Sequence, residues 1–296
     1  MSSPTTPVWF ITAASSGFGY ELAKTALNKG HRVIATARNP TKIQDLQEQG
    51  AETMALDVTD PIPIVEKIAQ DAMQKYGRVD YLINAAGYIL DGAVEESTAE
   101  EVQHQFNVNV FGTVNTIRAF LPFLRTQPMA APDRPRATIA TFGSLASWKG
   151  GPSYAFYSMT KACMSSLAES LHDELRPFGI TATVIEPGFF RTGFLKSGAR
   201  VSTQTRLPAY EDEKTPSAQL RKNLVVFNGK QLGDVKKGAD AIFAVLTTSG
   251  PAEGKDLPVR VILGSDCESM LRDKCQSTVN LLDTWGSLAR STDSRE

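Results

Sequence analysis

The sequence has few of the residues on which metal and disulfide chemistry depend. Of 296 residues only three are histidine and only three are cysteine, namely Cys163, Cys267 and Cys275. Neither set has the close spacing of a metal site, and an odd number of scattered cysteines argues against a disulfide framework. We therefore expect no metal and a reduced, cytoplasmic protein.

The chain also lacks an excess of one charge and any long apolar run. Lys and Arg number 31 against 32 Asp and Glu, which gives a formal net charge of -1. This balance argues against a protein that binds nucleic acid. No apolar run approaches the roughly 18 residues of a membrane helix, and residues 1–7 lack the basic start and apolar core of a secretory signal. We expect neither nucleic acid nor a membrane as a partner.

Short aliphatic runs do alternate with longer helical patterns. The predicted strands cover residues 8–13, 31–37, 52–56, 79–84, 137–142, 181–185 and 259–263. The predicted helices lie near 17–29, 40–49, 60–76, 98–126, 153–178 and 234–248, with a capping box at Ser97 and Glu100. Continuous apolar strands are typical of a sheet covered on both faces. The alternation predicts an α/β fold, a single Rossmann-type, doubly wound parallel sheet of seven strands flanked by helices.

No composition shift divides the chain, so we predict one domain over 1–296. Within it, 1–192 form the cofactor-binding and catalytic core, and 234–296 hold the last strand and the C-terminal helices. Residues 193–233 are long, mixed and charged, which is typical of a functional lid, so we expect them to cover the substrate. We expect 265–290 to form a helix packed back onto the body.

A turn of small residues follows the first predicted strand. It reads T-A-A-S-S-G-F-G and leads directly into a helix. A helix N-terminus offers unpaired N–H groups and a positive dipole end, and small residues let phosphates approach the backbone. The turn predicts a diphosphate site at Thr12, Ser15, Ser16, Gly17, Phe18 and Gly19.

Arg38 stands at the end of the second predicted strand, where dinucleotide folds contact the adenosine ribose. No acidic residue occurs between Glu21 and Asp45. A basic residue at this position favours a 2′-phosphate over a free 2′-hydroxyl. The sequence thus predicts NADP(H), with NAD(H) the less favoured cofactor.

Tyr157 and Lys161 are four residues apart in a helical pattern, so they share one face. A tyrosine with a pKa near 10 is a poor acid–base group at neutral pH, and moving that pKa to about 7 takes roughly 4 kcal/mol. An ammonium group about 4 Å away supplies roughly that much at an effective dielectric constant near 20. The pair predicts a tuned proton donor.

These motifs occur in an order that resembles the short-chain dehydrogenase/reductase family over essentially the whole chain. Ser144 precedes Tyr157 by thirteen residues, and Asn109 opens an Asn-Val-Phe-Gly segment. Ser147 competes with Ser144 but has the wrong separation, so we expect a turn residue there. Within the family the chain is most similar to the oxidoreductase branch of retinol and hydroxysteroid dehydrogenases.

The resemblance implies roles for individual residues. Tyr157 would be the general acid or base, Lys161 would tune it and bind the nicotinamide ribose, and Ser144 would hold the substrate oxygen. Asn109 would support a water relay to Lys161. Further cofactor contacts are implied at Asp57, Val58, Asn84, Ala85, Ala86, Gly87, Pro187, Gly188 and Thr192, beside Tyr157 and Lys161. Two positions depart from the pattern: Ala13 replaces a glycine, which is harmless only at negative φ, and Ala85 replaces an asparagine.

Aromatic residues crowd the loops that would close the pocket, and apolar walls are typical of small-molecule sites. We expect substrate contacts from Ser144 and from Tyr88, Trp148, Tyr154, Phe189, Phe190 and Phe194. The implied function is NADP(H)-dependent interconversion of a ketone and a secondary alcohol on a bulky, mostly apolar molecule. Two alternatives remain open: an enzyme of this fold repurposed for cyclisation or isomerisation, and a non-catalytic cofactor sensor. The resemblance also implies a homodimer through the helices at 98–126 and 153–178.

Overall fold

A seven-stranded parallel sheet forms the centre of the structure, a computed structural model that describes residues 6–131, 134–193 and 199–294. The strand order is β3-β2-β1-β4-β6-β7-β9, and every neighbouring pair is parallel. The order reverses direction at β1 and β4, which makes the sheet doubly wound and confirms the predicted fold. The strands are Val8–Ile11, Arg32–Ala37, Glu52–Ala55, Tyr81–Asn84, Ala137–Phe142, Ile180–Pro187 and Arg260–Leu263 for β1, β2, β3, β4, β6, β7 and β9.

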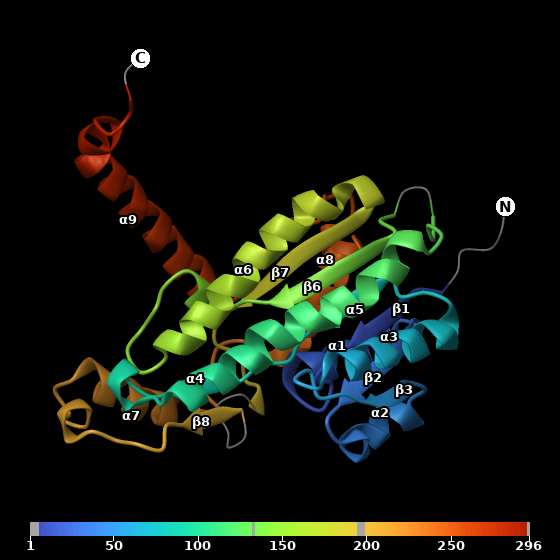
Figure 1. Cartoon of the computed structure of the whole chain (residues 1–296), viewed down its shortest axis with the longest axis horizontal. Coiled ribbons are helices and arrows are strands. Elements are labelled where there is room, and N and C mark those ends of the chain that lie inside the picture. Colours follow the sequence, from blue (N-terminus) through green and yellow to red (C-terminus); the bar gives the residue numbers. More distant parts are fainter. Residues whose placement is uncertain (1–5, 132–133, 194–198, 295–296) are drawn as a thin grey trace.

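Both faces of the sheet are buried, as the apolar strands predicted. In β1, Trp9 and Ile11 belong to one hydrophobic core and Val8 and Phe10 to the other, because successive side chains point to opposite faces. The first core includes residues of α1 (Gly17–Asn28), α2 (Gln44–Glu48) and α8 (Val235–Leu246). The second includes residues of α3 (Ile62–Tyr76), α5 (Gly112–Thr126) and α6 (Ala155–Leu175), which lie together in front of the sheet in Figure 1.

The predicted helix at 98–126 consists of three pieces. α4 (Ala99–Phe106) and α5 are joined by a π-helical turn over Asn107–Phe111. The capping box lies one residue later than predicted, at Thr98 and Glu101. Local π-helical turns occur frequently at functional sites, and this one contains Asn109.

A small second sheet was not predicted. β5 (Ile89–Asp91) pairs in parallel with β8 (Arg200–Ser202), so the chain after β4 meets the segment after β7. The segment continues through α7 (Pro216–Phe227), and it forms a lobe at the lower left of Figure 1. This lobe belongs to the predicted lid, although residues 194–198 of that lid lie outside the described residues.

The last helix differs from the prediction. α9 (Ser265–Arg290) is anchored by buried Cys267 at its start and then projects away from the body (Figure 1). Leu281, Leu282 and Trp285 are 58%, 62% and 57% exposed, so the expected packing is wrong. No glycine or proline interrupts residues 265–285, so the helix continues straight.

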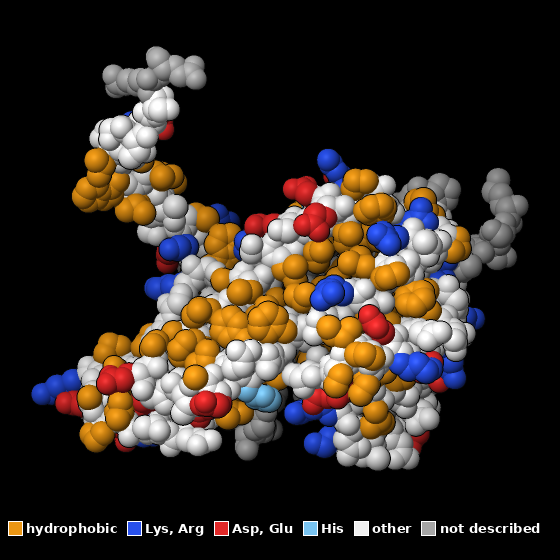
Figure 2. All heavy atoms as spheres, in the orientation of Figure 1, with side chains coloured by type: hydrophobic (Ala, Val, Ile, Leu, Met, Phe, Trp, Pro, Cys, Tyr) orange, Lys and Arg blue, Asp and Glu red, His pale blue; other side chains and the backbone are white. Residues whose placement is uncertain are grey.

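The surface shown in Figure 2 mixes acidic and basic side chains, with apolar side chains gathered on the projecting helix. Among the described residues, no helix has the length and apolar character needed to cross a bilayer.

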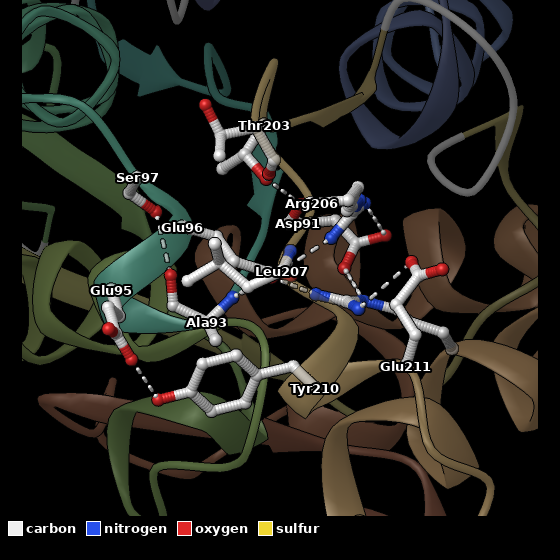
Figure 3. A network of polar contacts seen from close by, with 12 residues as sticks. Asp91, Ala93, Glu95, Glu96, Ser97, Thr203, Arg206, Leu207, Tyr210 and Glu211 are labelled. Atoms are coloured by element: carbon white, nitrogen blue, oxygen red, sulfur yellow. Dashed lines mark hydrogen bonds and ion pairs between the residues drawn. The ribbon is translucent and has the colours of Figure 1, made fainter.

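Buried ion pairs fasten the lobe to the body. Asp91 and Glu96 are each 1% exposed, and three arginines from the lobe surround them (Figure 3). Arg200 donates to Asp91 through Nε at 3.0 Å, Arg206 lies 3.3 Å from Glu96, and Arg221 pairs with both carboxylates. Because a buried carboxylate is stable only when it is paired, these contacts fix the lobe's position.

Glu96 gives this anchor a pH dependence. Burial by itself would raise the pKa of Glu96, but the amide groups of Ala93 and Leu207 and the Arg221 guanidinium together lower the pKa below its ordinary value. A lowered folded-state pKa stabilises the protein above the unfolded-state pKa, near 4.3, and this stabilisation is lost as the pH falls through the folded-state value.

We predict that Glu96→Gln lowers the free energy of unfolding at pH 7 by about 1.5–3 kcal/mol, the range for hydrogen bonds to charged groups. Urea unfolding from pH 7 to pH 3 measures the effect. The wild type should lose stability below about pH 5, and the variant should show a flatter dependence there. Parallel curves would exclude Glu96 as the titrating anchor.

Candidate active site

The turn between β1 and α1 has the conformation of an anion-binding loop. Ala13 has φ +52° and Gly17 has φ +59°, so backbone N–H groups turn inward. Ser16 is the N-cap of α1 but makes no side-chain capping bond, and the first turn holds no acidic residue. The N–H groups of this helix end therefore remain available to an anion.

Close packing around this turn explains its small residues. A Cβ on Gly19 would lie 2.8 Å from the carbonyl oxygen of Ala13, too close for any other residue. Thr12 Oγ1 accepts a 2.9 Å hydrogen bond from the Ala85 amide and so joins the ends of β1 and β4. Next to Ala85, the buried Oδ1 of Asn84 has no hydrogen-bond partner. The uncapped helix end fits a phosphate, and the Asn84 oxygen fits a hydroxyl or amide donor elsewhere on a dinucleotide.

Ser144, Tyr157 and Lys161 come together beside that turn. Ser144 follows β6, while Tyr157 and Lys161 lie in the first turns of α6, and all three are buried. Ser144 hydrogen-bonds the Tyr157 side chain. The Lys161 ammonium lies 5.5 Å from the centre of the Tyr157 ring and donates a 2.7 Å bond to the Phe142 carbonyl. The structure thus brings together three of the four catalytic residues that the resemblance implied.

Ser147 holds the turn after β6 in place. Its Oγ accepts from the Ser144 amide at 3.2 Å and donates to the Lys161 carbonyl at 2.9 Å. The buried Glu186, at the end of β7, accepts bonds from Trp148 Nε1 and Ser165 Oγ and pairs with Arg260 at 2.8 Å. These contacts connect β6, β7, β9 and α6 behind the three site residues.

Burial sets the pKa values of the pair. It lowers the pKa of Lys161 to about 8. It raises the pKa of Tyr157 far above 10, although the Ser144 hydrogen bond lowers that pKa and Tyr154 raises it further. The lowering of the Tyr157 pKa that the sequence predicted is therefore wrong, because desolvation raises this pKa instead. Tyr157 holds its proton at neutral pH.

Asn109 is buried behind the pair. Its Oδ1 accepts from the Tyr88 amide at 3.0 Å, and its Nδ2 donates to the Tyr88 carbonyl and to Thr160 Oγ1. A Cβ on Gly87 would lie 3.4 Å from Asn109 Oδ1 and 3.5 Å from Lys161 Nζ. Asn109 therefore lies near Lys161, with its amide bound to the backbone after β4.

One cavity contains the N-terminal turn of α1 and the Ser144, Tyr157 and Lys161 side chains. Several residues predicted to bind the cofactor line it: Ser16, Gly17, Phe18, Ala85, Gly87, Pro187, Gly188 and Thr192. The others predicted lie near the same edge but outside the lining: Thr12, Ser15, Gly19, Arg38, Asp57, Val58, Asn84 and Ala86. Among the latter, Arg38 is exposed at the end of β2 and makes no hydrogen bond or ion pair within the described residues.

The aromatic residues predicted to contact the substrate divide into two groups. Tyr154, Phe189 and Phe190 line the cavity. Tyr88 and Trp148 do not, because the Tyr88 ring packs at a tilt against His104 and Trp148 is held by Glu186 and Arg260. Phe194 lies outside the described residues.

Sequence reasoning missed much of the wall. The lobe supplies Ala199, Leu220, Leu224 and Gln231, and the body adds Ile89, Asp91, Phe142, Gly143, Leu145, Ala146 and Ser153. Among these residues only Asp91 has a recognisable sequence signal for a functional position, because it is a charged residue in an apolar run. The wall is mostly apolar, as expected of a site for a bulky apolar molecule.

Comparison with known proteins gives a consistent result. Residues 7–200 match the family model described as short chain dehydrogenase. The chain is 33% identical over 265 residues to oxidoreductase BOA17 of Botryotinia fuckeliana, covering 88% of this chain and 90% of the relative. A short-chain dehydrogenase structure from Streptomyces avermitilis aligns with a TM-score of 0.84 and 34% identity over 99% of this chain and 100% of the other. A Burkholderia phymatum structure in complex with NAD aligns with 0.72 and 22% over all of both chains, which shows the fold alone.

The strained Ala13 leads to a prediction. An alanine in the left-handed region costs about 1–2 kcal/mol, whereas glycine adopts it freely at a smaller entropic cost. We predict that Ala13→Gly raises the free energy of unfolding by about 0.5–1 kcal/mol, measured by urea denaturation. Ala85→Gly is the control, since Ala85 occupies the turn after β4 without a positive φ, and it should destabilise. Equal effects of the two changes would contradict the strain at Ala13.

Proposed function

Because the chain belongs to the short-chain dehydrogenase family, we propose that it interconverts a ketone and a secondary alcohol with NADP(H) on a bulky, mostly apolar small molecule. The observation that carries the proposal is the single cavity shared by the α1 turn and the side chains of Ser144, Tyr157 and Lys161. A cofactor bound along the turn would expose its reactive end to a substrate beside Tyr157.

In this mechanism Tyr157 donates its proton to the carbonyl oxygen. The raised pKa of Tyr157 keeps that proton in place until negative charge develops on the oxygen. Ser144, already bonded to Tyr157, holds the same oxygen as it charges. The Lys161 ammonium then stabilises the phenolate. Asn109, which is bonded to Thr160 and to the Tyr88 backbone, would support a water relay to Lys161. When bound, the nicotinamide supplies or accepts the hydride.

The residues that would hold the cofactor follow from the cavity. The free N–H groups at Ser16 and Gly17 would bind the diphosphate, Asn84 and Gly87 would lie along it, and Thr192 would meet the nicotinamide end. Arg38 would contact a 2′-phosphate, because its planar fork suits phosphate oxygens. The proposed preference for NADP(H) over NAD(H) rests on Arg38.

We predict that Arg38→Ala weakens NADPH binding about tenfold or more, since charge-assisted contacts contribute about 1.5–3 kcal/mol. NADH binding should change little. Arg32→Ala is the matched control, because Arg32 lies at the opposite end of β2 and stacks on Tyr76. Fluorescence titration with both cofactors measures the effect. Equal losses for the two cofactors, or a wild-type preference for NADH, would show that Arg38 does not read the phosphate.

We predict that Tyr157→Phe lowers turnover by roughly 10²–10⁴, the loss typical of a general acid. Cofactor affinity should survive, because the ring remains. Lys161→Ala should reduce both turnover and cofactor affinity, since Lys161 serves both. Steady-state kinetics and cofactor titration separate the two effects. A Tyr157→Phe variant with near wild-type turnover would remove Tyr157 from the chemistry.

The remaining parts of the chain fit this function as one domain. The lobe within 193–233 supplies Leu220, Leu224 and Gln231 to the cavity, so we assign it the role of substrate cover. Exposed Phe111, Met159 and Phe178 on the α4–α6 side supply the apolar surface for a homodimer. The three cysteines are unpaired, which supports a reducing, cytoplasmic location.

A further inference from the structure

Two buried polar oxygens in the cavity wall have no hydrogen-bond partner. Oδ1 of Asp91 and Oγ of Ser153 are both without one, although their residues are 1% and 4% exposed, and the only charge beside Asp91 Oδ1 among the described residues is Arg221 Nε at 3.5 Å. Both residues line the cavity. A buried polar group without a hydrogen-bond partner is unfavourable, so these two atoms mark a place where a ligand atom would complete the hydrogen bonding.

The backbone holds the two residues side by side. The Gly92 amide donates to the Ser153 carbonyl at 2.9 Å, and the Thr203 amide donates to the Asp91 carbonyl at 3.0 Å. Ser153 has φ +62°, an unfavourable conformation for serine. Strain of this kind is typical of functional sites, where surrounding contacts maintain it.

The charges around Asp91 limit what can bind. Arg200, Arg206 and Arg221 face the carboxylates of Asp91 and Glu96, and Arg221 also lies 3.9 Å from Glu211 (Figure 3). Three cations against two buried anions leave no negative charge to attract an ammonium group. A substrate carboxylate would face the carboxylate of Asp91. A neutral hydroxyl supplies the hydrogen bonds that both oxygens lack, because it donates to Asp91 Oδ1 and accepts from Ser153 Oγ.

We propose that Asp91 and Ser153 form a distal hydroxyl site, which recognises a hydroxyl group on the substrate remote from the reacting carbonyl. The inference rests on the proposed function, and it makes the substrate a hydroxyketone or a diol. Ser153 precedes Tyr157 by four residues, so their backbones lie within about 14 Å. A fused or linked ring system spans a separation of this order between the two polar groups of the substrate.

The test uses matched ketones that differ only at the remote position. 6-Hydroxy-1-tetralone, 6-methoxy-1-tetralone and 1-tetralone form a short series. 4-(4-Hydroxycyclohexyl)cyclohexanone, its methyl ether and 4-cyclohexylcyclohexanone form a longer one. Binding to the protein with NADP⁺ present is measured by calorimetry, and NADPH oxidation is measured separately. The wild type should bind the hydroxyl member of at least one series about 10- to 100-fold tighter than both partners, as for a hydrogen bond to a charged group.

Variants show whether the discrimination comes from these two oxygens. Ser153→Gly removes the hydroxyl while suiting the positive φ, and Asp91→Asn removes the charged acceptor. Both variants should reduce the ratio of affinities between the hydroxylated ketone and its unhydroxylated partner towards one. Glu96→Gln is the matched control, since Glu96 belongs to the same ion-pair cluster but does not line the cavity, and it should keep the preference.

Each outcome has a distinct meaning. Discrimination in binding without NADPH oxidation would support the distal hydroxyl site and contradict the proposed function. Turnover of both hydroxylated and unsubstituted ketones with equal efficiency would overturn the site and leave the function intact. A preference lost equally in Glu96→Gln, or no binding by any hydroxylated ketone, would also overturn the site.

Discussion

The parallel direction of the central strands determines where chemistry can occur in this molecule. Because β1, β4, β6 and β7 all run the same way, the loops that follow them open at one edge of the sheet. That edge receives the uncapped N-terminus of α1, the Gly87 turn, Ser144 and the Pro187–Gly188 turn. α6 then presents Tyr157 and Lys161 to the same place. Reversing any one of these strands would remove a required group from the cavity.

Burial is what gives these groups their chemical properties. The cavity wall desolvates Lys161, which lowers its pKa to about 8, and desolvates Tyr157, which holds its proton. The same exclusion of water favours pairing of the other polar groups nearby, as at Glu186 and Asn109. The buried oxygens of Asn84, Asp91 and Ser153 that lack a hydrogen-bond partner are the exceptions. The buried ion pairs at Asp91 and Glu96 extend this rule to the lobe, which closes the apolar side of the cavity. The proposed catalysis and substrate recognition thus depend on one desolvated space.

Much of this arrangement could be predicted from the sequence, because it follows from local patterns. Aliphatic runs predicted all seven strands of the central sheet to within two residues at each end. The helical spacing of Tyr157 and Lys161 predicted that they share a face, and the family resemblance added Ser144. The capping box was predicted one residue early, because Ser97 and Thr98 are both good caps and a glutamate follows each by three residues. For Ala13 the sequence predicted only that a negative φ would be harmless, because the sequence does not determine the sign of φ. The structure shows a positive φ there, and hence strain.

The substrate side was predicted less well, since it depends on contacts between distant segments. The pairing of β5 with β8 joins residues more than a hundred positions apart, and neither strand has a distinctive pattern. The sequence positions of Tyr88 and Trp148 suggest pocket residues. In the structure, however, Tyr88 packs against His104 and Trp148 bonds to Glu186, so neither side chain lines the cavity. α9 shows the same limit in reverse, because an amphipathic pattern indicates that a helix forms and not what it packs against.

The central claim, hydride transfer with proton donation from Tyr157, is tested most directly by stoichiometry. Absorbance of the reduced nicotinamide is followed while the alcohol formed from a converted ketone is quantified in the same sample. The account predicts one NADPH oxidised for each alcohol produced. Product formation at constant NADPH would contradict it and would identify an enzyme that uses this fold for chemistry without net redox change.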